Sequence, residues 1–382
     1  MTIAFVNGQI LTAAGFVSDQ ALLVAGEHIS ALVAATDTRA RSAAQVDLRG
    51  QLLLPGCIDA QVNGGGGVLF NDAPTVAGIR AIAAAHARFG TTGLLPTVIS
   101  DDPAVLARAI AAVDAAIAAA VPGILGIHIE GPYLSAARKG VHDAAHFLPL
   151  GPEALQLLCS LRRGVTLLTL APERAQPQTL TSLAAAGVIL AAGHTNATAS
   201  EIEVARRHGL RGFTHLFNAM SQLTVREPGT VGAALGEDQT WCGIIVDGRH
   251  VDARVLKVAL RAKRHDRFML VTDAMPVVGS EAHSFQLQGR TIQVVDGCCV
   301  DEHGTLAGSA LDMSAAVRNA MQLLDLPAAE AVRMASANPA DFLGLGASHG
   351  RLAPGFRADL VIADDDYRII DTWIGGRRCG ER

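Results

Sequence analysis

The chain has 382 residues, of which half are apolar and 18% are charged. At about 150 residues per domain this length predicts roughly two to three domains, and the apolar content excludes a disordered chain. A balance of 31 basic and 36 acidic residues gives a formal charge of -5. Because this charge provides no basic surface for neutralising phosphates, we expect no nucleic-acid partner.

The N-terminal 50 residues contain short strand patterns separated by turn residues. The patterns are punctuated by Asn7-Gly8, Ala14-Gly15 and Gly26. Such residues favour hairpin turns. We therefore expect small antiparallel strands at this end of the chain.

The central part contains eight continuous apolar runs that alternate with helix-like segments. Continuous runs rich in Val, Ile and Leu are typical of parallel strands covered on both faces. The clearest helix is 101–121, where Asp102 is placed as a cap, Pro103 suits the first turn and Pro122-Gly123 ends the pattern. Eight such units predict an α/β fold, a (β/α)8 barrel of the TIM type. The expected strands are Leu52–Val62, Thr92–Ile99, Ile124–Ile129, Val165–Leu170, Val188–Ala192, Gly212–Leu216, Cys242–Val246 and Phe268–Val271.

The C-terminal residues resume the short strand pattern of the N-terminus. Strands are expected at 360–362 and 369–375. We predict that residues 1–52 and 351–382 meet in one small β domain, beside a catalytic barrel domain of residues 53–350. A doubly wound open sheet explains eight strand units less simply.

The sequence shows no sign of membrane insertion or export. The most apolar stretch, 104–129, is interrupted by Arg108, Asp114 and Pro122-Gly123, so no run of about 18 apolar residues remains. The first 15 residues lack the features of a secretory signal. The six cysteines show no C-x-x-C spacing. We expect a cytoplasmic protein with reduced thiols and no membrane partner.

Three polar residues stand at the ends of expected strands. Glu130 ends the third strand, His194 follows the fifth and His215 lies at the end of the sixth. Barrel enzymes build their sites at these strand ends. Taken singly, Glu130 suits a salt bridge and each histidine suits an ordinary core or surface position. Together, one carboxylate and two imidazoles predict a catalytic site for zinc or a similar divalent ion, with one coordination position open.

Asp273 follows the eighth expected strand. A carboxylate beside a metal site can take a proton from water and return it to a leaving amine, as general base and then general acid. The alternative interpretation is a helix cap before Ala274.

Five motifs occur in order along the chain. They are Pro55-Gly56-Cys57-Ile58-Asp59, Gly126-Ile127-His128-Ile129-Glu130-Gly131-Pro132, Ala192-Gly193-His194-Thr195, Thr214-His215-Leu216-Phe217-Asn218-Ala219-Met220 and Val271-Thr272-Asp273-Ala274-Met275. Together they resemble the amidohydrolase superfamily and, within it, the family of N-acetylglucosamine-6-phosphate deacetylases. The likeness extends over almost the whole chain. It implies a metallo-barrel with a small β-sandwich domain formed by both termini, and it assigns Glu130, His194 and His215 to the metal.

The resemblance also implies an activity and further roles. The expected reaction hydrolyses the acetamide of N-acetyl-D-glucosamine 6-phosphate to D-glucosamine 6-phosphate and acetate, in amino-sugar catabolism. His142 would polarise the acetamide carbonyl, while Asn218, Ala219, Arg226 and His250 would hold the sugar phosphate. The alternative without a catalytic role is an ordinary surface loop histidine for His142. For Arg226 it is an ion pair with the adjacent Glu227. Members of the family are usually homodimers, so a homodimer is expected, and Arg226 is a candidate to act across its interface.

One departure from the wider superfamily concerns the first strand. Many members carry H-x-H there and hold two metals, whereas this chain has Gln61-Val62-Asn63. Neutral amides are weak ligands beside imidazole and carboxylate. We therefore expect one divalent ion, with zinc favoured over iron, cobalt or manganese, and Gln61 and Asn63 as secondary site residues.

Three rival interpretations stay open at this point. The first is a deacetylase for the galactosamine epimer, and the second is a cyclic-amide hydrolase with the same metal. The third is a noncatalytic barrel that serves as a scaffold. The presence of Glu130, His194, His215 and Asp273 together argues against the scaffold.

Overall fold

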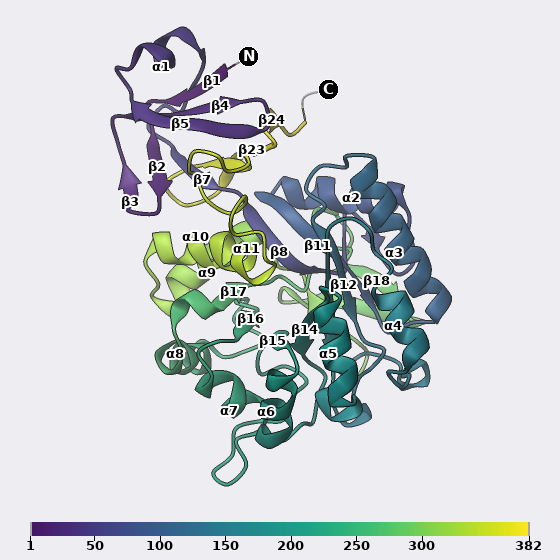
Figure 1. The fold of residues 1–382 in the computed structure, drawn as a ribbon. Helices are drawn as coiled ribbons and strands as arrows, with labels where there is room; N and C mark the ends of the chain where they lie inside the picture. The colour runs from purple at the N-terminus through teal and green to yellow at the C-terminus, as the bar shows by residue number, and fades with distance from the viewer. Residues whose placement is uncertain (1, 381–382) are drawn as a thin grey trace.

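The computed structural model describes residues 2–380, which form a barrel and a smaller β-sandwich (Figure 1). The sandwich has one sheet in the order β5-β4-β1-β6 and a second in the order β24-β23-β22-β7-β2-β3. Its strands are β1 Thr2–Val6, β2 Gln9–Thr12, β3 Gly15–Val17, β4 Gln20–Ala25, β5 His28–Ala34, β6 Ala44–Asp47, β7 Leu52–Pro55, β22 Leu360–Ala363, β23 Ile369–Ile374 and β24 Arg377–Arg378.

Strand pairing joins the two ends of the chain within the sandwich. β7 pairs in parallel with β2 and antiparallel with β22, so that Leu53 lies opposite both Ile10 and Ile362. The space between the sheets is filled from both termini, with Phe5 against Trp373 at a ring-centroid distance of 5.1 Å. This finding confirms the predicted sandwich of both termini. The domain boundaries at residues 52 and 350 stay a prediction.

Eight parallel strands form the barrel within the described residues, as the sequence predicts. Each strand pairs with the next along the chain, from β8 to β17. The ring closes where Val62, at the end of β8, bridges Ala274 beyond β17. The strands are β8 Cys57–Val62, β11 Thr91–Ile99, β12 Gly126–Glu130, β13 Val165–Leu170, β14 Ile189–Ala192, β15 Leu210–Phe213, β16 Trp241–Ile244 and β17 Phe268–Leu270.

The first expected strand, Leu52–Val62, is two strands that belong to different sheets. The break falls at Gly56, whose amide donates to Asp359 O at 3.0 Å in the terminal region. The next amide, of Cys57, donates to Gly90 O beside the barrel at 2.9 Å. Both halves are buried, so the apolar run continues across the change of sheet.

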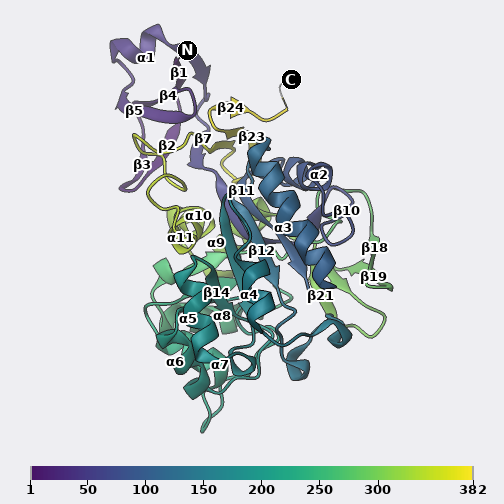
Figure 2. The ribbon, with the colours of Figure 1, turned by 45° about the vertical axis from the view of Figure 1, so that its right-hand side comes forward.

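Helices cover the outside of the barrel (Figure 2). The helix expected at 101–121 is α3, Pro103–Ala118. Asp102 is its N-cap residue but makes no side-chain cap hydrogen bond, and the left-handed Ala120 follows its end. The others are α1 Thr38–Ser42, α2 Val76–Ala87, α4 Pro152–Leu158, α5 Pro177–Ala185, α6 Ala199–Arg207, α7 Gly229–Gly236, α8 Ala253–Ala262, α9 Met313–Leu324, α10 Ala328–Ala335 and α11 Ala337–Phe342.

A four-stranded antiparallel sheet follows the last barrel strand and was not expected from the sequence. Its strands β18 Ser284–Leu287, β19 Arg290–Val295, β20 Cys298–Val300 and β21 Leu306–Ser309 pair in sequence order. A smaller hairpin, β9 Gly64–Gly65 with β10 Val68–Leu69, follows β8. Among residues 2–380, no helix is both long and apolar enough to cross a bilayer.

Candidate active site

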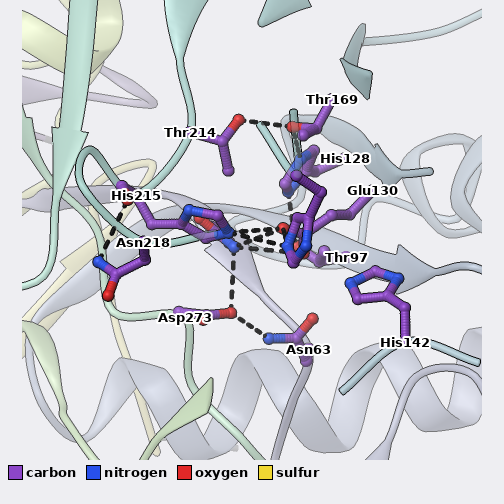
Figure 3. Close-up of polar contacts among 12 residues, drawn as sticks. Asn63, Thr97, His128, Glu130, His142, Thr169, Thr214, His215, Asn218 and Asp273 are labelled. Atoms are coloured by element: carbon purple, nitrogen blue, oxygen red, sulfur yellow. Dashed lines mark hydrogen bonds and ion pairs between the residues drawn. The ribbon is translucent and has the colours of Figure 1, made fainter. Parts of the chain in front are cut away.

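The polar residues at the ends of β12, β14 and β15 converge on one point (Figure 3). His215 Nε2 lies 3.0 Å from Glu130 Oε1, and His194 Nε2 lies 3.3 Å from the same oxygen. The two Nε2 atoms are 3.2 Å apart. All three side chains are buried. Parallel strands bring their carboxyl ends to the same rim of the barrel, which explains this meeting of residues far apart in the chain.

Hydrogen bonding orients the donor atoms of this cluster. His194 Nδ1 lies 2.9 Å from Arg138 O; because a carbonyl only accepts, Nδ1 carries a proton, so that the neutral form of the ring has its lone pair on Nε2. One carboxylate oxygen and two imidazole nitrogens therefore face a common point, with donor atoms all within 4.8 Å of one another. This donor set fits a divalent ion such as zinc.

The Glu130 carboxylate and the neighbouring His215 imidazole stabilise each other's charged forms. Burial opposes ionisation of Glu130, but hydrogen bonds and charges from His194 and His215 outweigh it and hold the pKa of Glu130 well below its usual value. The same contact raises the pKa of His215 although burial lowers it. The site thus favours an anionic carboxylate that a cation can neutralise.

Asp273 lies beside this cluster. Asn63 Nδ2 donates to Asp273 Oδ1 at 2.6 Å, and Gln61 Nε2 donates to the same oxygen at 3.1 Å. Because both amides donate to Oδ1, neither occupies Oδ2, which is the oxygen available for proton transfer. Burial, reinforced by the charge of Glu130, raises the pKa of Asp273 to about 6.

Gln61 also donates to Glu130, at 3.3 Å to each carboxylate oxygen. The amide nitrogen of Gln61 therefore faces two carboxylates. The side chain acts as a hydrogen-bond donor near the cluster rather than as a metal ligand. Asn63 likewise directs its amide nitrogen to a carboxylate. These contacts give a physical reason why a second ion is not expected at the end of β8.

A buried polar network lies next to the cluster inside the barrel. His128 Nε2 is 2.8 Å from Thr169 Oγ1, which is 2.6 Å from Thr214 Oγ1, while His128 Nδ1 is 3.2 Å from Thr97 Oγ1. Burial lowers the pKa of His128 to about 4, so the ring is neutral at pH 7. The network satisfies polar groups that would otherwise be costly to bury.

Asp59 supports the segment that carries Asp273. It accepts hydrogen bonds from the amide of Gln61 at 3.2 Å and from the hydroxyl of Thr272 at 2.5 Å. Burial raises the pKa of Asp59 to about 7. These contacts tie the end of β8 to the residues that follow β17.

A cavity of about 570 Å³ opens above the cluster. The loop residues Gly304–Leu306, from the segment that precedes and begins β21, form part of its wall. Nine residues expected at the site line this cavity: Asn63, Glu130, His142, His194, His215, Asn218, Ala219, His250 and Asp273.

His142 and His250 are both held by hydrogen bonds at the cavity wall. His142 Nδ1 lies 2.8 Å from Ser100 Oγ, and burial lowers the pKa of His142 to about 3. The side chain is buried, unlike an ordinary surface loop histidine. His250 Nδ1 lies 2.5 Å from Asp247 Oδ2.

Arg226 is not among the residues that line the cavity. It lies exposed on the loop between β15 and α7, which projects from the molecule in Figure 1. The preceding Val225 is 100% exposed. Glu227 accepts hydrogen bonds from the amides of Ala199 and Gly229. Within one chain, therefore, the structure does not bring Arg226 to the other site residues.

Two supporting groups were missed by the sequence interpretation. Ser100 follows the end of β11, so the rule that found Glu130 could also have found it. The carbonyl of Arg138, which orients His194, is a backbone group with no side-chain signature.

Residues 52–379 match the model of the amidohydrolase family. This match covers all eight barrel strands and the C-terminal strands β22 to β24, and the chain belongs to that family. Members of the superfamily are metal-dependent hydrolases that act on amide and related bonds, in agreement with the candidate metal site.

Named relatives are similar over nearly the full chain. An N-acetylgalactosamine-6-phosphate deacetylase of Shewanella sp. (strain ANA-3) is 47% identical over 85% of this chain and 82% of its own. An N-acetylglucosamine-6-phosphate deacetylase of Haemophilus influenzae is 34% identical over 99% of both. The crystal structure of N-acetylglucosamine-6-phosphate deacetylase from Pasteurella multocida has a TM-score of 0.95 at 35% identity, covering 99% of both chains.

Proposed function

We propose that this chain hydrolyses the acetamide of N-acetyl-D-glucosamine 6-phosphate, giving D-glucosamine 6-phosphate and acetate. The observation that carries the proposal is the placement of Asp273 beside the three converging donors, at the base of the cavity. The H. influenzae and P. multocida relatives support the choice of substrate. The role is then the breakdown or recycling of amino sugars.

Glu130, His194 and His215 would hold one divalent ion, for which we favour zinc over iron, cobalt or manganese. Such an ion polarises a carbonyl and lowers the pKa of a bound water to about 7. Gln61 and Asn63 keep the neighbouring carboxylates in place through their amide hydrogens.

Asp273 moves the proton in this mechanism. Its Oδ2 takes a proton from the attacking water while Asn63 and Gln61 hold Oδ1. The water oxygen bonds to the acetamide carbon, and the carbon–nitrogen bond breaks as Asp273 returns the proton to the sugar nitrogen. Acetate and a free amine result, and no covalent enzyme intermediate is needed.

His142 acts on the acetamide oxygen. A Ser100 hydroxyl that donates to Nδ1 leaves the ring proton on Nε2. Because the ring is neutral, Nε2 donates one hydrogen bond to the oxygen that becomes negative as water adds.

The phosphate is held by Asn218, the backbone of Ala219 and His250 at the cavity, together with Arg226 from a second copy of the chain. The exposed loop of Arg226 and the fully exposed Val225 support a homodimer in which this loop reaches the partner's cavity. A guanidinium is suited to a phosphate dianion. Because a phosphorylated sugar does not cross a bilayer readily, we place the enzyme in the cytoplasm.

The galactosamine epimer is the second candidate substrate. The Shewanella relative that is named for it is 47% identical, compared with 34% for the H. influenzae protein. The two candidates are distinguished by measuring kcat/KM for acetate release from the 6-phosphates of both N-acetylated sugars. A higher value for N-acetylgalactosamine 6-phosphate would replace the first proposal with the second. Hydrolysis of neither, by metal-loaded protein, would overturn both.

Glu130→Gln should remove the divalent ion, because the neutral amide is a poor ligand and leaves two imidazoles alone. Metal analysis of purified protein should find one ion per wild-type chain and almost none in the variant, and chelation should abolish acetate release from wild type. The exposed Glu153→Gln variant is the control and should retain its ion. Two ions per chain, both needed for turnover, would contradict this arrangement.

Asp273→Asn should keep the ion and the substrate but lower kcat by a factor of roughly 10² to 10⁴. The amide can turn its oxygen to the Asn63 and Gln61 donors, so folding is preserved. Metal content, KM and kcat are measured beside the exposed control Asp365→Asn. Near-normal turnover by Asp273→Asn would remove this carboxylate from the mechanism.

Arg226→Ala should raise KM for the phosphorylated substrate and leave hydrolysis of an unphosphorylated analogue unchanged. Mixing it with Asp273→Asn, under conditions where subunits exchange, tests the interface. A mixed dimer then has one complete site, since the Arg226→Ala chain keeps Asp273 and receives Arg226 from its partner. Activity should rise on mixing, whereas no recovery in a sample shown to contain mixed dimers would place Arg226 outside the partner's site.

A further inference from the structure

A second cluster of metal-ligating side chains lies beside the cavity. Asp247 and His250 lie on the loop after β16, and Cys298 begins β20 of the four-stranded antiparallel sheet. Within the described residues, each offers a donor atom within 4.8 Å of the other two. The side chains of Asp247 and His250 are 5% and 4% exposed, and Cys298 is 6% exposed. None of these residues belongs to the Glu130 cluster.

Hydrogen bonds hold the loop half of this cluster in place. Asp247 Oδ1 accepts from the amides of Arg249 at 2.8 Å and His250 at 2.9 Å. Its other oxygen, Oδ2, faces His250 Nδ1 at 2.5 Å. One carboxylate oxygen thus shapes the loop, while the second is directed at the imidazole.

The sheet half is anchored to the barrel. Cys298 pairs with Ser309 of β21. Ser309 donates through its hydroxyl to Thr272 O at 2.5 Å and through its amide to Asp273 O at 2.9 Å. Arg249 adds a contact to Asp296 at 3.9 Å. The thiol is therefore presented to the loop by a paired strand rather than by a free segment.

We propose that Asp247, His250 and Cys298 form a second, inhibitory site for a thiophilic divalent ion, Zn²⁺ or Cd²⁺. Sulfur, nitrogen and oxygen donors from three residues leave a fourth position for water. The thiolate makes this site softer than the Glu130 cluster, which contains no sulfur.

The Asp247–His250 pair needs only a small adjustment to bind an ion. Ligands about 2.05 Å from a tetrahedral ion lie roughly 3.3 Å apart, so the 2.5 Å contact between Asp247 and His250 must widen by about 0.8 Å. The Cys298 thiol gives its proton to water and binds as thiolate. A neutral His250 that carries its proton on Nδ1 binds through that nitrogen by transferring the proton to Nε2.

The displacement of the His250 ring explains the inhibition, which rests on the proposed function. His250 lines the cavity and is proposed to hold the sugar phosphate. With the ion on Nδ1, the ring loses its hydrogen bond to Asp247 and shifts as that contact widens by about 0.8 Å, so Nε2 leaves the position at which it is proposed to meet the phosphate. We expect excess Zn²⁺ to raise KM for the phosphorylated substrate.

Titration of the holoenzyme with Cd²⁺ tests the ion site without measuring activity. Wild type should bind Cd²⁺ with the ultraviolet charge-transfer band of a cadmium thiolate. Cys298→Ser should lose this band and bind that ion at least about 100-fold more weakly, since even loss of an outer hydrogen-bond partner weakens metal sites by 10- to 100-fold. Cys299→Ser, which changes the adjacent buried thiol, is the matched control and should keep the band.

An activity measurement separates this inference from the proposed function. Cys298→Ser should retain basal acetate release and resist excess Zn²⁺ that inhibits wild type and Cys299→Ser. A thiolate band that survives in Cys298→Ser, or that is lost in folded Cys299→Ser as well, overturns the site. If the band depends on Cys298 but no acetamido sugar phosphate is hydrolysed, the ion site stands and the proposed function fails.

Discussion

The parallel pairing of the barrel strands is the constraint on which the site depends. Register along β12, β14 and β15 brings their carboxyl ends to one rim, where Glu130 Oε1 meets the Nε2 atoms of His194 and His215. Placing a carboxylate and two imidazoles together without water costs free energy unless their charges and protons match. The Arg138 carbonyl provides part of that match by fixing the tautomer of His194. Barrel closure then adds Asp273 beside them.

The barrel and its strand-end residues could be predicted because both follow from short patterns. Continuous apolar runs mark buried parallel strands, and a polar residue directly after such a run lies at the active end, as for Glu130 and His215. The sheet of β18 to β21 escaped this reasoning because its strands are short and partly polar, as the exposed residues of Arg290–Val295 show. Cys298 was therefore assigned no ligand partner from the sequence. Its proximity to His250 is a tertiary contact that no local pattern encodes.

Arg226 illustrates a different limit. Its assignment to the phosphate came from a family resemblance, while the chain by itself leaves the residue exposed on a projecting loop. A sequence does not distinguish a residue that acts in its own subunit from one that acts in another. The amides of Gln61 and Asn63 were interpreted more securely, since their chemistry already made them poor ligands and the contacts with Asp273 use them as donors.

The β-sandwich has a consequence for the order of synthesis. β7 completes its pairing only with β22, which lies roughly 300 residues later in the chain. While the intervening polypeptide emerges from the ribosome, one side of β7 has no strand with which to form hydrogen bonds. The part of the apolar core that Leu360 and Trp373 later cover stays exposed to water. Contacts so distant along the chain slow folding, and unpaired edges invite association. One side of β7 therefore stays unpaired until the residues of β22 have been synthesised.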